Sequence, residues 1–121
     1  MVVTGIHHVG IPVFDLARAS AFYQVVLDIP LSRTPSYNPE SIVFLDCGGS
    51  MVHLIRYGEG IQRPGRRGVH WAFEVEDVDV ACARVVAAGC EIEIPVSKRP
   101  DGTPYCFFYD PEGNRIELCK H

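Results

Sequence analysis

The sequence lacks the features that mark several large classes of protein. It has no apolar run that approaches the roughly 20 residues needed to span a bilayer. It has no long basic run and a net charge of −4, which argues against nucleic acid as a partner. Its first residues, Met1–Gly5, lack the basic start and the cleavage site of a secretory signal peptide. We therefore expect neither a membrane nor a nucleic acid among its partners.

Paired cysteine spacings are missing as well. No two cysteines stand in a CxxC arrangement, and their number is odd: Cys47, Cys82, Cys90, Cys106 and Cys119. This pattern favours a reduced, cytoplasmic protein over a disulfide scaffold. The chain has 121 residues, of which 47% are hydrophobic and 21% are charged. We therefore expect one ordinary soluble globular domain spanning residues 1–121.

The first half of the chain alternates between strand and helix patterns. Residues 6–13 carry apolar side chains at every second position, which predicts a strand. Asp15 is a predicted helix N-cap, and apolar residues at helical spacing predict a helix over 16–27. Further strands are predicted, weakly at 31–34 and then at 41–47 and 51–57, the last two joined by a turn at Gly48-Gly49.

The same order of elements returns in the second half. Residues 58–68 hold four glycines and three arginines and are the predicted linker between module one, 1–57, and module two, 69–121. In module two Asp77 is a predicted N-cap, and Gly89 is predicted to end the helix that follows it. The predicted elements are strands at 69–75, 90–95, 105–109 and 114–119 and a helix over 78–88.

An internal repeat relates four polar residues. A shift of 62 (70 − 8) places His8 on His70, and a shift of 64 (117 − 53) places His53 on Glu117. Glu117 lies in the middle of the strand over 114–119, where alternation predicts one apolar and one polar face. A carboxylate there needs a partner, because burying an unpaired charge is costly. Two modules related by a pseudo-two-fold axis can bring all four side chains to one point.

Three imidazoles and one carboxylate form a good donor set for a divalent cation of the Zn, Ni, Mn or Fe(II) kind. The plainer interpretation is that each strand histidine is only a hydrogen-bonded structural residue. His53 is the most dispensable ligand, since His8, His70 and Glu117 already make a 2-His-1-carboxylate triad. Regular strand alternation points His7 away from His8, so we expect His7 to be structural.

The chain resembles the vicinal oxygen chelate superfamily, which includes glyoxalase I, bleomycin-resistance proteins, fosfomycin-resistance enzymes and extradiol dioxygenases. The matching stretches are 6–13 with Asp15-Leu16 and Phe22-Tyr23, 70–75 with Asp77-Val78, and 108–118. The resemblance implies an α+β fold of two tandem βαβββ modules. Their mixed sheets are expected to curve around a cup, with helices on the outer face and a homodimer completing the cup. It also implies metal ligands at His8, His53, His70 and Glu117.

The resemblance says less about the substrate. Glyoxalase I carries a glutathione-binding arginine at the position of Pro12 and an asparagine near the position of Tyr57. This chain has neither residue there, which argues against glutathione as the co-substrate. We expect a metal-dependent lyase or isomerase that acts on vicinal oxygens, with Glu117 both as ligand and as proton shuttle. The alternatives are an Fe(II) ring-cleavage dioxygenase and a non-catalytic protein that binds a small molecule such as an antibiotic.

Several residues are candidates for substrate binding at the expected cup. Tyr105 and Phe107 share a strand face and either stack on a planar substrate or simply pack in the sheet. Arg56 and Tyr57, just before the linker, are further candidates, since an arginine at the rim can clamp an anion. The basic pair Lys98-Arg99 has the same two interpretations, an anion clamp or a solvated loop.

Overall fold

The computed structural model describes residues 2–57 and 68–120. The chain divides into two compact units, Met1–Ile61 and Gln62–His121. The predicted linker over 58–68 lies outside the described residues except for Gly68. Each unit is described by itself.

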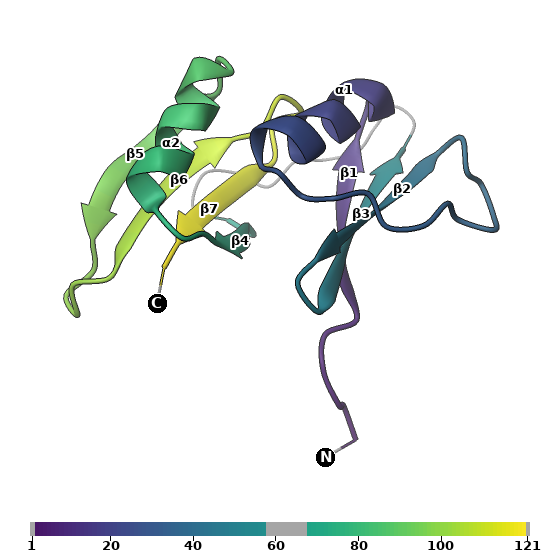
Figure 1. The fold of residues 1–121 in the computed structure, drawn as a ribbon, viewed down its shortest axis with the longest axis horizontal. Coiled ribbons are helices and arrows are strands. Elements are labelled where there is room, and N and C mark those ends of the chain that lie inside the picture. The colour runs from purple at the N-terminus through teal and green to yellow at the C-terminus, as the bar shows by residue number, and fades with distance from the viewer. Residues whose placement is uncertain (1, 58–67, 121) are drawn as a thin grey trace. The chain divides into compact units, whose positions relative to one another are not determined.

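Unit 1 is a three-stranded mixed sheet with one helical segment. Its elements are β1 (His8–Val13), α1 (Leu16–Ala21), the π-helix η1 (Phe22–Val26), β2 (Ile42–Cys47) and β3 (Ser50–Arg56) (Figure 1). The strand order is β1-β3-β2, with β1 parallel to β3 and β2 antiparallel to it. Ile11, Val13, Val52 and Leu54 are at most 1% exposed and form the core with α1 and η1. Alternation along β1 and β3 therefore leaves Gly10 and His53 on the opposite face.

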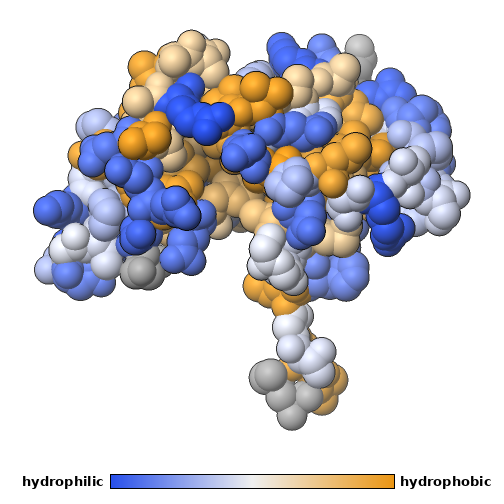
Figure 2. Space-filling view, viewed as in Figure 1, coloured by the Kyte–Doolittle hydropathy of each residue, from blue (hydrophilic) through white to orange (hydrophobic). Residues whose placement is uncertain are grey.

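Two expectations for unit 1 are corrected by the structure. The weak strand predicted at 31–34 is reduced to an isolated bridge between Leu31 and Leu45. Pro30 and Pro35 flank this segment and have no N–H to donate, so a ladder cannot extend through them. The first strand begins at His8 rather than at Ile6, and the segment before it extends away from the sheet (Figures 1 and 2). Ile6 is accordingly 75% exposed.

The predicted helix over 16–27 forms, but its second half is wound as a π-helix. Asp15 caps α1 as expected, accepting a 3.0 Å hydrogen bond from the backbone N–H of Arg18. The N–H of Leu27 then donates to the carbonyl of Phe22, five residues earlier, at 3.2 Å. The wider turn accompanies the burial of two successive aromatic side chains, Phe22 and Tyr23.

Unit 2 contains the complete βαβββ arrangement. Its elements are β4 (Trp71–Glu74), α2 (Val78–Ala87), β5 (Glu91–Lys98), β6 (Pro104–Tyr109) and β7 (Arg115–Cys119). The strand order is β4-β7-β6-β5, with β4 parallel to β7 and the other pairs antiparallel. Helix α2 packs on β5, β6 and β7 (Figure 1). Asp77 caps α2 through the N–H of Val80, and Gly89 follows it with a φ of +86°, as the sequence predicts.

The fold class expected from the sequence is confirmed: the protein is α+β, built from two βαβββ-like modules with mixed sheets. The strand predicted at 90–95 is longer than expected, because β5 continues through Pro95 to Lys98. A register irregularity between Ile94 and Ser97 accommodates this proline on an edge strand. Among the described residues, no helix is both long and apolar enough to cross a membrane. All five cysteines are free.

The last strand has the predicted alternation of one apolar and one polar face, but both faces are covered. All five residues of β7 are buried, including Arg115 at 5% and Glu117 at 6% exposure. β7 lies between β4 and β6, so it has no open edge. Ile116 and Leu118 face α2, whereas Arg115 and Glu117 are covered by side chains on the other face of the sheet.

Candidate metal centre

Two of the predicted ligands, His8 and His53, meet in unit 1. β1 and β3 are adjacent and parallel, and their register pairs Gly10 with His53. His8 lies two residues before Gly10, so it shares a face of the sheet with His53. The two imidazole rings stack with centroids 3.8 Å apart and planes inclined by 16°. On its other side His53 stacks on Phe44 from β2, at 4.1 Å.

His53 is held in the form that binds metals. It is 7% exposed, and its Nε2 is buried without a hydrogen-bond partner. Burial lowers the pKa of His53 below its ordinary value, and His8, His7 and Arg33 lower it further by repelling the protonated ring. A neutral imidazole with an unsatisfied ring nitrogen is a ready ligand for a cation.

His7 does not point away from His8, contrary to the expectation from strand alternation. Its Nδ1 lies 2.8 Å from Nδ1 of His8, and its ring centroid lies 6.4 Å from that of His53. His7 precedes the first residue of β1, so the alternation of a regular strand does not apply to it. No sequence signal other than adjacency would have found this contact.

The other two predicted ligands, His70 and Glu117, meet in unit 2. Nε2 of His70 lies 3.0 Å from Oε1 of Glu117. The parallel register of β4 and β7 pairs Ala72 with Glu117, as the register of β1 and β3 pairs Gly10 with His53. His70 stands two residues before Ala72, so each unit presents an equivalent pair of side chains. The register confirms the internal repeat that the sequence shifts indicate.

Two arginines, neither predicted as a metal-site residue, surround the His70–Glu117 pair. Arg99 forms an ion pair with Oε2 of Glu117. Arg115 donates from Nη1 to Nδ1 of His70 at 3.2 Å and pairs with Glu93 at 2.7 and 2.9 Å. Because a guanidinium only donates, neutral His70 carries its proton on Nε2 and donates it to Glu117. The carboxylate is thus held by one imidazole and one guanidinium.

The predicted substrate residues fall into two groups. Phe107 lies opposite Glu117 in the register of β6 and β7, and its ring makes an edge contact with His70 at 4.9 Å and with Tyr105 at 5.9 Å. These two aromatic residues therefore line the face that carries Glu117. Arg56 ends β3 on the face opposite His53 by alternation, and Tyr57 follows it with 45% of its surface exposed.

The donors suit a divalent cation within each unit. Two ligand atoms about 2.0–2.2 Å from one cation stand about 3.0–3.4 Å apart. His70 Nε2 and Glu117 Oε1, which share a hydrogen bond, are 3.0 Å apart, so a cation that replaced the Nε2 proton would fit this spacing. His53 adds a buried nitrogen that no protein group satisfies. In the part of the chain that the structure describes, no group of three or more His, Cys, Asp or Glu side chains is gathered that could hold a metal ion. Each pair therefore offers two donors within its unit, and we call each pair a candidate half-site.

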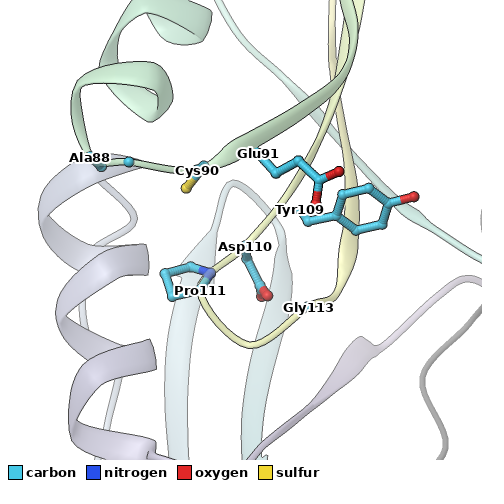
Figure 3. Close-up of a pocket in the computed structure, with 8 residues that line it drawn as sticks. Ala88, Cys90, Glu91, Tyr109, Asp110, Pro111 and Gly113 are labelled. Atoms are coloured by element: carbon cyan, nitrogen blue, oxygen red, sulfur yellow. The ribbon is translucent and has the colours of Figure 1, made fainter.

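A separate pocket of about 540 Å³ lies where α2 ends and β5 begins, against the turn between β6 and β7 (Figure 3). Glu91, Tyr109 and Asp110 contribute polar groups to it. The Asp110 carboxylate accepts bonds of 2.8–3.0 Å from Glu112 and Asn114 in its own turn. The carboxylate therefore stabilises the turn. The pocket is lined by none of the predicted metal ligands.

Comparisons with known proteins agree with this architecture. Residues 5–118 match the family model described as the glyoxalase/bleomycin resistance protein/dioxygenase superfamily. A lactoylglutathione lyase of Haemophilus influenzae is 33% identical over 123 residues, covering 94% of this chain and 90% of that protein. A lactoylglutathione lyase of Agrobacterium tumefaciens has a TM-score of 0.73 at 26% identity, covering 98% of this chain and 94% of that chain. A fosfomycin resistance protein of Listeria monocytogenes has a TM-score of 0.79 at 24% identity, covering 98% and 94%, and shows likeness of fold alone.

Proposed function

The chain belongs to the glyoxalase/bleomycin resistance protein/dioxygenase superfamily, and from this we propose that it is a divalent-metal-dependent enzyme of the lyase or isomerase type. The proposed ligands are His8, His53, His70 and Glu117, and the proposed cation is Zn, Ni, Mn or Fe(II). The substrate is a small molecule with vicinal oxygens. We further propose a homodimer that works in the cytoplasm, which is in keeping with five free cysteines.

The observation that carries this proposal is the equivalence of the two half-sites. Each unit uses the strand pair at the same register to present two side chains on the face away from its helix. One half-site offers two imidazoles and the other offers an imidazole and a carboxylate. Structural histidines have no reason to recur at repeat-equivalent positions, whereas the ligands of one cation supplied by a duplicated module do. The ligands come from both units, of one chain or of two copies.

The proposed roles of the chain's own residues follow from their contacts. A bound cation supplies Lewis acidity that polarises vicinal oxygens of the substrate. Glu117 is the residue that can hold a proton at Oε1, where it already accepts a hydrogen bond from His70. The rings of Tyr105 and Phe107 border this carboxylate and exclude water from one side of it.

A binding protein without turnover is the second candidate. The aromatic pair Tyr105–Phe107 favours it, because aromatic rings can hold a planar molecule by stacking. Such a protein would bind its ligand equally well with and without metal. Ring cleavage with Fe(II) remains the alternative chemistry if iron is the bound ion.

The first experiment measures metal content by mass spectrometry on untagged protein. We compare the wild type with Glu117→Gln, which removes the charge of the ligand while keeping its shape. Glu74→Gln is the matched control, since Glu74 lies in the same sheet but is exposed. The proposal expects near-stoichiometric metal in the wild type and in Glu74→Gln and a loss in Glu117→Gln. If the wild type neither contains nor takes up a divalent ion, the enzyme proposal is wrong.

A further inference from the structure

Arg99 and Arg115 both lie near Glu117, but their charges and hydrogen-bond donors are satisfied to different degrees. Arg115 is buried and satisfied: Glu93 takes two of its hydrogen bonds, the carbonyl of Gly68 lies 3.4 Å from Nη1, and Phe107 lies under the guanidinium at 4.1 Å. Arg99 has Glu117 as its anion, and its Nη1 is buried without a hydrogen-bond partner. The guanidinium of Arg99 therefore retains an unused donor beside the proposed metal ligand.

The backbone of Arg99 is fixed, and its head group lies on an aromatic ring. Its N–H donates to the carbonyl of Thr103 at 2.9 Å, and its carbonyl accepts from Gly102 at 2.8 Å, which closes the turn between β5 and β6. The side chain is 29% exposed and lies over the ring of Tyr105, with Cζ 4.5 Å from the ring centroid. A guanidinium on an aromatic face keeps its fork of donors directed sideways, where a carboxylate can be bound by two parallel hydrogen bonds.

The charges near Glu117 change when it becomes a ligand. Without a cation, the negative charge of Glu117 is matched by Arg99, and Arg115 is matched by Glu93. A divalent cation at Oε1 of Glu117 would leave Arg99 on Oε2, but it would add two positive charges that the single carboxylate cannot balance. An excess of positive charge in a partly buried site is unfavourable, so this part of unit 2 would then favour a negatively charged ligand.

We propose that Arg99 is the residue that binds the carboxylate of an anionic substrate, so that the substrate class is a small 2-hydroxy or 2-oxo carboxylic acid. This inference rests on the proposed function, because the cation at Glu117 would create the excess of positive charge that calls for an anion. The unused Nη1 of Arg99 is the donor that the anion would take. Arg99 thus selects substrates that carry a negative charge, whereas Glu117 is a ligand of the cation.

The test uses calorimetric titration of the Zn²⁺-loaded full chain with lactate and with lactamide. The two probes have the same shape and the same vicinal oxygens, and only lactate is charged. Variants are Arg99→Gln, which loses the charge, Arg99→Lys, which keeps it, and Lys98→Gln. Lys98 is the matched control, because it is the exposed neighbouring cation at the end of β5. Circular dichroism of each variant checks that it is folded.

We expect the wild type and Lys98→Gln to bind lactate at least tenfold more tightly than lactamide. Zn²⁺ itself prefers lactate to lactamide, so Arg99→Gln should lower the preference at least about fivefold without abolishing it. The variant should bind Zn²⁺ at least as tightly as the wild type, and Arg99→Lys should retain most of the preference. An unchanged preference in a Zn²⁺-loaded Arg99→Gln variant would overturn the assignment of Arg99 and leave the metal site standing. Failure of the wild type to bind Zn²⁺ or any other divalent ion would overturn both proposals.

Discussion

The imidazole rings of His8 and His53 are stacked with their centroids 3.8 Å apart. The contact joins the first and last strands of unit 1, which are neighbours in the sheet although 45 residues (53 − 8) separate the two histidines. Stacking on Phe44 from the other side fixes the plane of His53. The ring is thereby oriented before any ligand arrives, at the cost of a buried nitrogen without a partner.

Replacing His53 with phenylalanine should separate stability from metal binding. His53→Phe keeps the aromatic stack between His8 and Phe44 and removes the unsatisfied Nε2. We expect the metal-free variant to be as stable as the wild type or more stable by about 1 kcal/mol, since removing a buried unsatisfied polar atom is favourable. Its affinity for divalent metal should fall at least tenfold. Urea denaturation and metal titration measure the two effects, and an unchanged metal affinity would remove His53 from the ligand set.

Removing Glu93 should destabilise unit 2 strongly. The Glu93 carboxylate takes two hydrogen bonds from Arg115, which is 5% exposed, and a hydrogen bond from the hydroxyl of Tyr109. Glu93→Ala leaves a buried guanidinium unpaired, and we expect a loss of about 3–5 kcal/mol in the free energy of unfolding. Urea denaturation measures this loss.

The matched control for this prediction is Glu91→Ala. Glu91 lies two residues earlier in the same strand and is exposed, so its removal should cost less than about 1 kcal/mol. Replacing the whole ion pair, with Glu93→Leu and Arg115→Met together, should recover most of the stability lost in Glu93→Ala. Equal stability of the two single variants would show that the buried pair contributes nothing.

The thiols of Cys90 and Cys106 should resist alkylation in the folded protein. Burial, helped by Asp110, raises the pKa of Cys90 to about 11, and burial together with Cys82 raises that of Cys106 to about 12. Since the thiolate is the reactive form, at pH 8 these values reduce the reactive fraction about 100-fold and about 1,000-fold from that of a thiol with a pKa of 9. The alkylation rate of Cys90 should rise about tenfold per pH unit until the pH approaches its pKa.

Mass spectrometry of iodoacetamide-treated protein, with and without urea, measures these rates for each cysteine. The unfolded chain is the reference, because all its thiols have ordinary pKa values. Labelling of Cys106 in the folded chain at the rate seen in urea would contradict its burial at 0% exposure.

The turn between β2 and β3 should not tolerate a side chain. Gly48 and Gly49 have φ values of +53° and +88°, in the left-handed region that favours glycine. Gly49→Ala should cost about 1 kcal/mol in the free energy of unfolding. Gly10→Ala is the control, since a Cβ there would meet only Ile55 Cδ1 at an ordinary 3.5 Å, and β1 should keep its stability to within about 0.5 kcal/mol. A thermal melt of each variant distinguishes the two cases.

The fold and the pairing of the ligands were accessible to sequence reasoning because both depend on periodicity. Alternation and turn residues locate the strands. The two shifts relate His8 to His70 and His53 to Glu117, and the structure finds these residues in equivalent registers. Such patterns can be recognised within a short stretch of sequence, and they recur in the second module. Both N-caps and the Gly48-Gly49 turn could be predicted because these residues favour one local backbone conformation.

The surroundings of Glu117 were not accessible in the same way. Arg99 reaches it from the turn after β5, and nothing in the spacing of the two residues indicates the ion pair. Burial of the polar residues of β7 depends on what covers the strand from either side, which alternation does not encode. The contact of His7 with His8 depends on where β1 begins, and strand ends are the least determined part of a pattern.

The strand order also has a consequence for how the protein is made. In each unit the first strand pairs with the last, β1 with β3 and β4 with β7. During synthesis, β1 can find its neighbour once Arg56 has left the ribosome. The apolar side of β4 must wait for β7, the last strand to emerge, and that strand brings Glu117 with it. The second sheet is therefore completed at the same point of synthesis at which Glu117, the only carboxylate among the four proposed ligands, becomes available.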